Sequence, residues 1–278
     1  MKELLMNKFN GILMCTDLDG TLLRGDKTIS KENKEAIEYF KSEGGLFTFI
    51  TGRMPYYVSD MYEAINPNCP FGCVNGGGIY DHRSGEYLWT LPIDDSVRVL
   101  VEHIDKNIPD IGIQVSTFYK TYFYKDSEAM TAFRKASGLP NTVRHYNDVS
   151  EPIGKIVFAD FEESNIQLLE KLLRSHALAD KFSFIRSDKT LFEILPNGVD
   201  KGTLLTKMAE LIGIDMKRTV AVGDYNNDVP MLRAAGLGIA VSNAVDAALA
   251  AADYVTVSNE EHAIAKIISE LDSGKLII

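Results

Sequence analysis

The sequence has little cysteine, fewer basic than acidic residues, and no long apolar run. Its 278 residues include three cysteines, too few for a disulfide framework in a chain of this size, which favours a reducing compartment. Lys and Arg number 29 against 39 Asp and Glu, a formal charge of -10, so no basic field is available to hold a nucleic-acid backbone. No apolar run reaches the roughly 20 residues of a membrane span. We therefore expect a cytoplasmic protein without a nucleic-acid or membrane partner.

The composition otherwise matches a folded globular protein. Hydrophobic residues make up 45% of the chain and charged residues 24%, close to the average of such proteins and unlike disordered or fibrous sequences. At roughly 100 to 200 residues per domain, the length indicates about two domains. No feature of the sequence sets an oligomeric state.

Short apolar runs separated by helical patterns make up both ends of the chain. Residues 11–16 and 45–51 are two such runs, and a helix between them begins at the N-cap Ser30. Further runs occupy residues 71–74, 219–222, 237–241 and 254–257. Strands alternating with helices predict an α/β fold, a Rossmann-like parallel sheet covered on both faces, with active sites at the carboxyl ends of the strands.

The middle of the chain has a different pattern, in which several strand candidates surround few helices. The strand candidates are residues 111–116, 121–125, 155–159, 182–185 and 191–195, and a helix is expected over residues 164–173. This pattern predicts an α+β domain inserted into the α/β one. We place the α/β core at residues 1–84 and 192–278 and the inserted α+β cap at residues 85–191.

Two acidic motifs follow predicted strands. The segment DLDGTLL at residues 17–23 places Asp17 and Asp19 at the end of the first strand, where carboxylates suit Mg²⁺, which takes hard oxygen ligands. The segment GDYNND at residues 223–228 follows a later strand, and its Asp224, Asn227 and Asp228 share one side of a helical turn. The structural alternatives are an Asp-Gly turn for the first and helix capping for the second. Together they favour a metal site, because two acidic strand ends on one sheet edge repel unless a cation joins them.

Two smaller segments suit a phosphate group. Thr51 and Gly52 follow the second strand and offer a hydroxyl and backbone N–H groups, although a Thr-Gly turn is a common structural element. Lys201 opens a predicted helix, where a cation is unfavourable to the helix dipole unless an anion compensates it. A solvated surface lysine is the alternative.

Four segments resemble, in this order along the chain, the four motifs of the haloacid dehalogenase superfamily of phosphatases. They are DLDGTLL, TGR at residues 51–53, DKG at residues 200–202 and GDYNND. Within this superfamily, the chain resembles the Cof-type hydrolases, which carry a C2-type α/β cap between the second and third motifs. The segments NGGGIY at residues 75–80 and SNAVDAALAAADYVTVSN at residues 242–259 resemble further parts of that family. The resemblance spans nearly the whole chain. One departure is His262, which stands after two acidic residues where the family often has Gly.

The resemblance implies a Mg²⁺-dependent phosphomonoester hydrolase. Asp17 would attack phosphorus and form an aspartyl phosphate, and Asp19 would protonate the leaving alcohol and then activate water. Mg²⁺ would be held by the Asp17 carboxylate, the Asp19 carbonyl and Asp224, with Asp228 ordering metal-bound water. The groups expected to bind the phosphoryl oxygens or lie near them are Thr51, Gly52, Lys201 and Asn227.

The resemblance also limits the substrate to small phosphorylated metabolites such as sugar phosphates, nucleotides or cofactor phosphates, with the cap supplying specificity. A phosphomutase uses the same Asp17 and Asp19 and stays open as an alternative. A module that binds a phosphorylated ligand without turnover is a second alternative.

Overall fold

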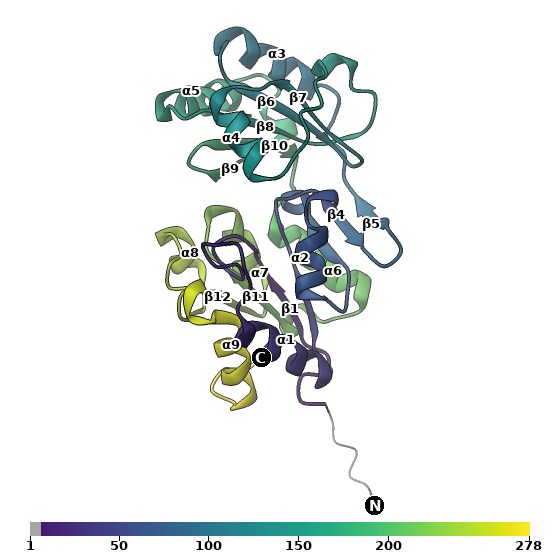
Figure 1. Ribbon diagram of the computed structural model, residues 1–278, viewed down its shortest axis with the longest axis vertical. Coiled ribbons are helices and arrows are strands. Elements are labelled where there is room, and N and C mark those ends of the chain that lie inside the picture. The colour runs from purple at the N-terminus through teal and green to yellow at the C-terminus, as the bar shows by residue number, and fades with distance from the viewer. Residues whose placement is uncertain (1–6) are drawn as a thin grey trace, which may run out of the picture. The chain divides into compact units, whose positions relative to one another are not determined.

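The computed structural model describes residues 7–278, which form two compact units (Figure 1). The first unit comprises the chain up to Thr51 together with Val58–Trp89 and Asp200–Ile278, and the second comprises Gly52–Tyr57 and Thr90–Val199. The division into core and cap at residues 84/85 and 191/192 stays a prediction. Judged by its contacts, the short segment Gly52–Tyr57 also belongs to the second unit.

The first unit is built on a five-stranded parallel sheet with the order β13-β12-β11-β1-β2. Its strands are β1 (Leu13–Thr16), β2 (Leu46–Phe49), β11 (Thr219–Gly223), β12 (Leu237–Ala240) and β13 (Tyr254–Val255). The central strands are buried on both faces, as the unbroken apolar runs predicted. The sheet is therefore the predicted α/β core.

Six helices of the first unit follow strands along the described chain. They are α1 (Lys31–Ser42), α2 (Ser59–Ile65), α6 (Lys201–Ile212), α7 (Val229–Ala234), α8 (Asp246–Ala251) and α9 (Ala263–Asp272). One sheet face, with Leu13 and Ala221, packs against Leu204 and Met208 of α6. Met14 lies on the opposite face of β1 and is fully buried too. Within residues 7–278, the helices are too short or too polar to cross a bilayer.

A second, three-stranded sheet extends the first unit. It consists of β3 (Phe71–Cys73), β4 (Gly78–Asp81) and β5 (Glu86–Thr90), in that order. A single parallel bridge from Ile50 to Gly72 links it to the end of β2. The sequence predicted the first of these strands, as the apolar run at residues 71–74, but not β4 and β5.

The second unit is an antiparallel sheet with the order β7-β6-β8-β10-β9 and three helices. The strands are β6 (Gly112–Thr117), β7 (Thr121–Lys125), β8 (Ile153–Ala159), β9 (Phe182–Asp188) and β10 (Leu191–Pro196). The helices are α3 (Val97–Asn107), α4 (Glu128–Ala136) and α5 (Glu163–Arg174). This is the α+β pattern predicted for the middle of the chain.

Alternation along the strands of the second unit divides its side chains between two faces. Ile156 and Phe158 of β8 join the larger apolar cluster with residues of α3 and α5. Ala159 points the other way and packs with Met130 of α4. The sheet is therefore covered by helices on both sides.

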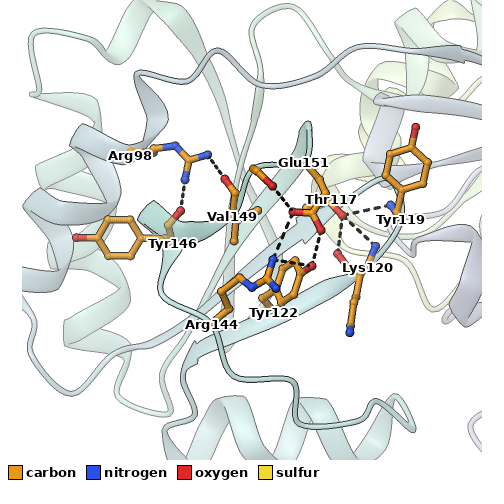
Figure 2. A network of polar contacts seen from close by, with 10 residues as sticks. Arg98, Thr117, Tyr119, Lys120, Tyr122, Arg144, Tyr146, Val149 and Glu151 are labelled. Carbon is orange, nitrogen blue, oxygen red and sulfur yellow. Dashed lines mark hydrogen bonds and ion pairs between the residues drawn. The ribbon is translucent and has the colours of Figure 1, made fainter.

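A polar network fixes the loop that precedes β8 (Figure 2). The Tyr122 hydroxyl donates to Glu151 at 2.5 Å and accepts from Arg144 at 3.2 Å. Arg144 also lies over the Tyr122 ring, with its guanidinium carbon 4.5 Å from the ring centroid. Arg98 of α3 donates to the carbonyl oxygens of Tyr146 and Val149. These bonds hold an irregular segment whose own backbone forms few regular hydrogen bonds.

His262, which stands where the family often has Gly, adopts a left-handed conformation with φ 62° just before α9. A side chain with a Cβ is strained there, whereas Gly is not. Replacing His262 with Gly should therefore give a protein about 1 kcal/mol more stable than replacing it with Ala. Urea unfolding of the two variants measures the difference, and both lose the same contacts to Arg24 and Glu32. Equal stability of the two variants would contradict this strain.

Candidate active site

The predicted motifs meet at the carboxyl edge of the parallel sheet in the first unit. Asp17 directly follows β1, and Asp224 directly follows β11, the neighbouring strand. Thr51 lies two residues beyond β2 and is buried. Parallel strands end at the same edge, so residues far apart in the sequence become neighbours there.

Lys201 joins two of the acidic residues. Its Nζ lies 2.5 Å from Asp17 Oδ1 and 2.5 Å from Asp228 Oδ1. Only 1% of the Lys201 side chain is exposed, which excludes a solvated surface lysine. Lys201 is the first residue of α6, whose N-cap Asp200 accepts from the Thr203 backbone N–H. A lysine at a helix start is expected to have an anion nearby, and here the carboxylates of Asp17 and Asp228 supply that negative charge.

Burial dominates the electrostatics of this group. It raises the pKa of the Asp17 carboxyl well above its usual range, and the charges of Asp228 and Asp224 raise it further, while Lys201 opposes the shift. Burial also raises the pKa of Asp224, to about 6, with a further contribution from the charge of Asp228. For Lys201, burial disfavours the ammonium, but the carboxylates of Asp17 and Asp228 outweigh it and raise its pKa. Lys201 is therefore a permanent cation in this site.

Asp228 and Asp224 are held by different partners. Asp228 Oδ2 accepts from the backbone N–H groups of Asp224 and Tyr225 at 2.9 and 3.0 Å. Asp224 Oδ1 accepts from the Thr21 hydroxyl at 2.7 Å. The capping box of this turn is formed by Tyr225 and Asp228, so Asp224 is not the residue that caps it. The Asp224 carboxylate instead faces the DLDGTLL segment.

Gly20 makes this approach possible. Its φ is +83°, and a Cβ built on it would lie 2.5 Å from Asp224 Oδ2. Any larger residue would both strain the backbone and push the Asp224 carboxylate away. The glycine of the motif thus places one acidic segment against the other.

The oxygen atoms of this site suit a divalent cation. One ligand atom each of Asp17, Asp224 and Asp228 lie within 4.8 Å of one another. Three carboxylates beside a single ammonium, that of Lys201, leave an excess of negative charge when all are ionised. Hard carboxylate oxygens and uncompensated negative charge are what Mg²⁺ binds in proteins. The residues present therefore fit the predicted metal.

Protonation of Asp224 should compete with this metal. Its pKa is raised to about 6, against roughly 4 for an unfolded Asp. Between these values the folded, metal-free protein holds a proton that the unfolded chain has lost, so its stability falls as pH rises through this window. Mg²⁺ needs the ionised carboxylate, so we expect the Mg²⁺-induced rise in unfolding temperature to be much larger at about pH 7 than at about pH 5. An equal rise at both pH values would contradict this expectation. Asp224→Asn is the control, in which the pH dependence of the Mg²⁺-induced rise in unfolding temperature should be lost.

Three further predicted residues have other partners in this structure. Asp19 Oδ1 lies 2.8 Å from Lys27 Nζ, and the Asp19 side chain is 40% exposed. Gly52 is the first residue of the short segment that belongs to the second unit, and its carbonyl accepts from Lys155 at 3.0 Å. Asn227 Nδ2 donates to Asn75 Oδ1 at 3.1 Å. Asp19 and Asn227 thus bond to residues outside the Asp17–Lys201–Asp228 cluster.

Several residues that support the site were not predicted from the sequence to be functional. Thr21 holds Asp224, as described, and Asn75 contacts Asn227. Asn243 Nδ2 donates to the Gly20 carbonyl at 2.8 Å. Thr21, Asn75 and Asn243 all lie in segments that resemble the family, so this resemblance was the available signal. Their contacts span long stretches of sequence and follow only from the fold.

Residues 14–268 match the family of haloacid dehalogenase-like hydrolases. The chain belongs to this family. The match covers every motif described above and confirms the resemblance seen in the sequence.

Curated members of the haloacid dehalogenase-like hydrolase family resemble the chain over almost its full length. The chain is 30% identical over 263 residues to 5-amino-6-(5-phospho-D-ribitylamino)uracil phosphatase YitU of Bacillus subtilis (strain 168), with 93% of this chain and 96% of the relative covered. It is 28% identical over 273 residues to pyridoxal phosphate phosphatase YbhA of Escherichia coli (strain K12), with 92% and 97% covered. This hydrolase is therefore an enzyme of the phosphatase class in the superfamily.

A solved structure shows the same fold. The haloacid dehalogenase-like hydrolase from Bacteroides thetaiotaomicron matches with a TM-score of 0.83 and 24% identity, over 94% of this chain and 99% of that one. The predicted fold class, a parallel α/β core with an additional α+β region, is confirmed.

Proposed function

We propose that the protein is a Mg²⁺-dependent phosphomonoester hydrolase that works through an aspartyl phosphate on Asp17. The observation that carries this proposal is the buried cluster in which Lys201 contacts both Asp17 and Asp228 while Asp224 lies close by. A carboxylate next to a permanent cation and further acidic oxygens suits attack on a phosphoryl group, whose transfer depends on positioning and charge stabilisation.

The reaction would take two steps. In the first, an Asp17 carboxylate oxygen bonds to phosphorus, the bond from phosphorus to the ester oxygen breaks, and Asp19 gives its proton to the departing alcohol. In the second, Asp19 takes a proton from water, whose oxygen bonds to the same phosphorus as the bond to Asp17 breaks. Phosphate leaves, and Asp17 and Asp19 return to their starting states. For this, Asp19 must exchange its contact with Lys27 for a substrate oxygen.

Mg²⁺ would be held by Asp17 and Asp224 with the Asp19 carbonyl, and Asp228 would order its water. When bound, it would neutralise the charges of the carboxylates and of the phosphoryl group. Lys201 opposes the rise in the Asp17 pKa that burial causes and would orient the Asp17 carboxylate, since its ammonium is held between two carboxylates. The residues that would position the phosphoryl oxygens are Thr51, Gly52, Lys201 and Asn227.

The relatives support a small phosphorylated metabolite as substrate. One acts on a phosphorylated ribitylaminouracil and another on pyridoxal phosphate, as their names state. Both compounds are phosphate monoesters of primary alcohols on a small polar molecule. We infer a substrate of this class, with specificity set by residues of the second unit.

The test is phosphate release from a panel of compounds with Mg²⁺ or with EDTA. The panel contains 5-amino-6-(5-phospho-D-ribitylamino)uracil, pyridoxal phosphate, sugar phosphates, nucleotides and an aryl phosphate. Release that requires Mg²⁺ supports the proposal, and the order of kcat/KM across the panel ranks the substrates. Binding of these compounds without any release would overturn the hydrolase and favour a module that only binds them.

A further inference from the structure

A strained turn lies beside the proposed phosphate site in the first unit. Val74, Asn75 and Gly76 follow β3 and have φ values of 59°, 51° and 118°. Left-handed conformations suit Gly, are tolerated by Asn, and are rare for a β-branched residue such as Val. Val74 and Asn75 are both fully buried. Such strain persists only where the surroundings hold it in place, and it concentrates at functional sites.

The turn is held by two segments of the proposed site. The Asn75 backbone N–H donates to the Thr51 carbonyl at 3.1 Å. Gly76 lies against the residue before Lys201, because a Cβ at this glycine would come 2.3 Å from the carbonyl oxygen of Asp200. The turn therefore lies against both the segment after β2 and the start of α6.

The side chain that the turn presents contacts a third segment. Asn75 Oδ1 accepts from Asn227 Nδ2 at 3.1 Å, a contact between residues that are 152 positions apart. The Asn75 side chain is buried, so it cannot rotate freely, and the bond fixes which way the Asn227 amide faces. One turn thus touches the segments of Thr51, Lys201 and Asn227.

We propose that Asn75 is a positioning residue for phosphate binding, held by the left-handed turn so that it orients Asn227. The inference rests on the proposed function, in which Asn227 lies near the phosphoryl group. Asn75 acts through Asn227 and does not itself need to touch the substrate. The strain at Val74 is explained because a relaxed, extended path would carry Asn75 away from Asn227.

The test uses Asn75→Gly, which tolerates the left-handed backbone but removes the acceptor oxygen. Loss of one such bond should raise KM for the best substrate and the inhibition constant of inorganic phosphate by about fivefold, with a smaller change in kcat. In the Asn227→Ala background, the same substitution should change these constants less than about twofold. Asn75→Asp keeps an oxygen acceptor and should keep the coupling to Asn227.

The control is Asn66→Gly, the same exchange at an exposed left-handed residue that ends α2. It should leave KM and the phosphate constant unchanged. Unfolding temperatures of all variants check that each is folded. Unchanged constants in a folded Asn75→Gly protein, or effects that simply add in the double variant, would overturn the role of Asn75.

Failure of the proposed function gives a different result. If the wild-type protein binds inorganic phosphate in the presence of Mg²⁺ but hydrolyses nothing, the hydrolase proposal fails. Calorimetric titration with phosphate then still compares wild type with Asn75→Gly. A loss of phosphate affinity that depends on Asn227 supports the positioning role without any turnover, and equal affinities overturn it.

Discussion

Replacing Asp17 with Asn is expected to lower kcat for phosphate release by at least about a thousandfold. The amide carries no charge and is a poor nucleophile, so the first bond to phosphorus does not form. The amide also removes one of the two negative charges that neutralise Lys201. Acid quenching of the reaction with labelled substrate should trap phosphate on the wild-type protein and none on the variant.

The matched control for this substitution is Asp60→Asn on α2, an exposed aspartate outside the acidic cluster. It should retain the kcat of the wild type. Loss of activity in both variants would point to a general effect of the exchange. An Asp17→Asn protein that retains more than about one tenth of the activity would rule out Asp17 as the nucleophile.

Replacing Lys201 with Met should lower both stability and activity. Methionine has a similar length but no charge, so Asp17 and Asp228 would face each other in a buried site without their common cation. Removing one partner of a buried ionic group costs about 3–5 kcal/mol. We expect a loss of this size in the free energy of unfolding by urea without Mg²⁺, together with a loss of kcat of at least about a hundredfold. Lowering the pH should recover part of the stability, because the carboxylates become protonated.

Two variants test this explanation for Lys201. Adding Asp228→Asn to Lys201→Met removes one of the unpaired charges and should restore stability without restoring activity. Lys207→Met, on the same helix, replaces a half-exposed lysine that pairs with Glu210 and should change stability by less than about 0.5 kcal/mol. A Lys201→Met protein within about 1 kcal/mol of the wild type would show that the buried cluster is not coupled as described.

The sequence predicted the core of this protein well because its signals are local. The apolar run before Asp17 is a buried strand, and Ser30 caps α1 by accepting from the Asn33 N–H at 3.1 Å. Acidic residues after two such strands could be placed at one sheet edge from the general rule for parallel sheets. The meeting of Asp17, Asp224 and Asp228 follows from that rule.

Other features depend on contacts that the sequence does not reveal. The helix α3 was not predicted, although the apolar spacing of Val97, Leu100 and Ile104 is typical of a helix. The left-handed path of Val74 contradicts the β propensity of valine, so local signals point away from it. The burial of Lys201 could not be predicted either, because only the fold brings two carboxylates to the start of α6.

The place of β1 between β2 and β11 in the parallel sheet has a consequence for synthesis. Leu13 pairs with Thr219 of β11, about 200 residues later in the chain. At the usual rate of translation, the apolar strand that leads to Asp17 waits on the order of ten seconds or more for this neighbour. During that time β1 can pair with β2 alone and leaves its other edge open. We expect the nascent chain to need protection from aggregation until the ribosome has passed β11.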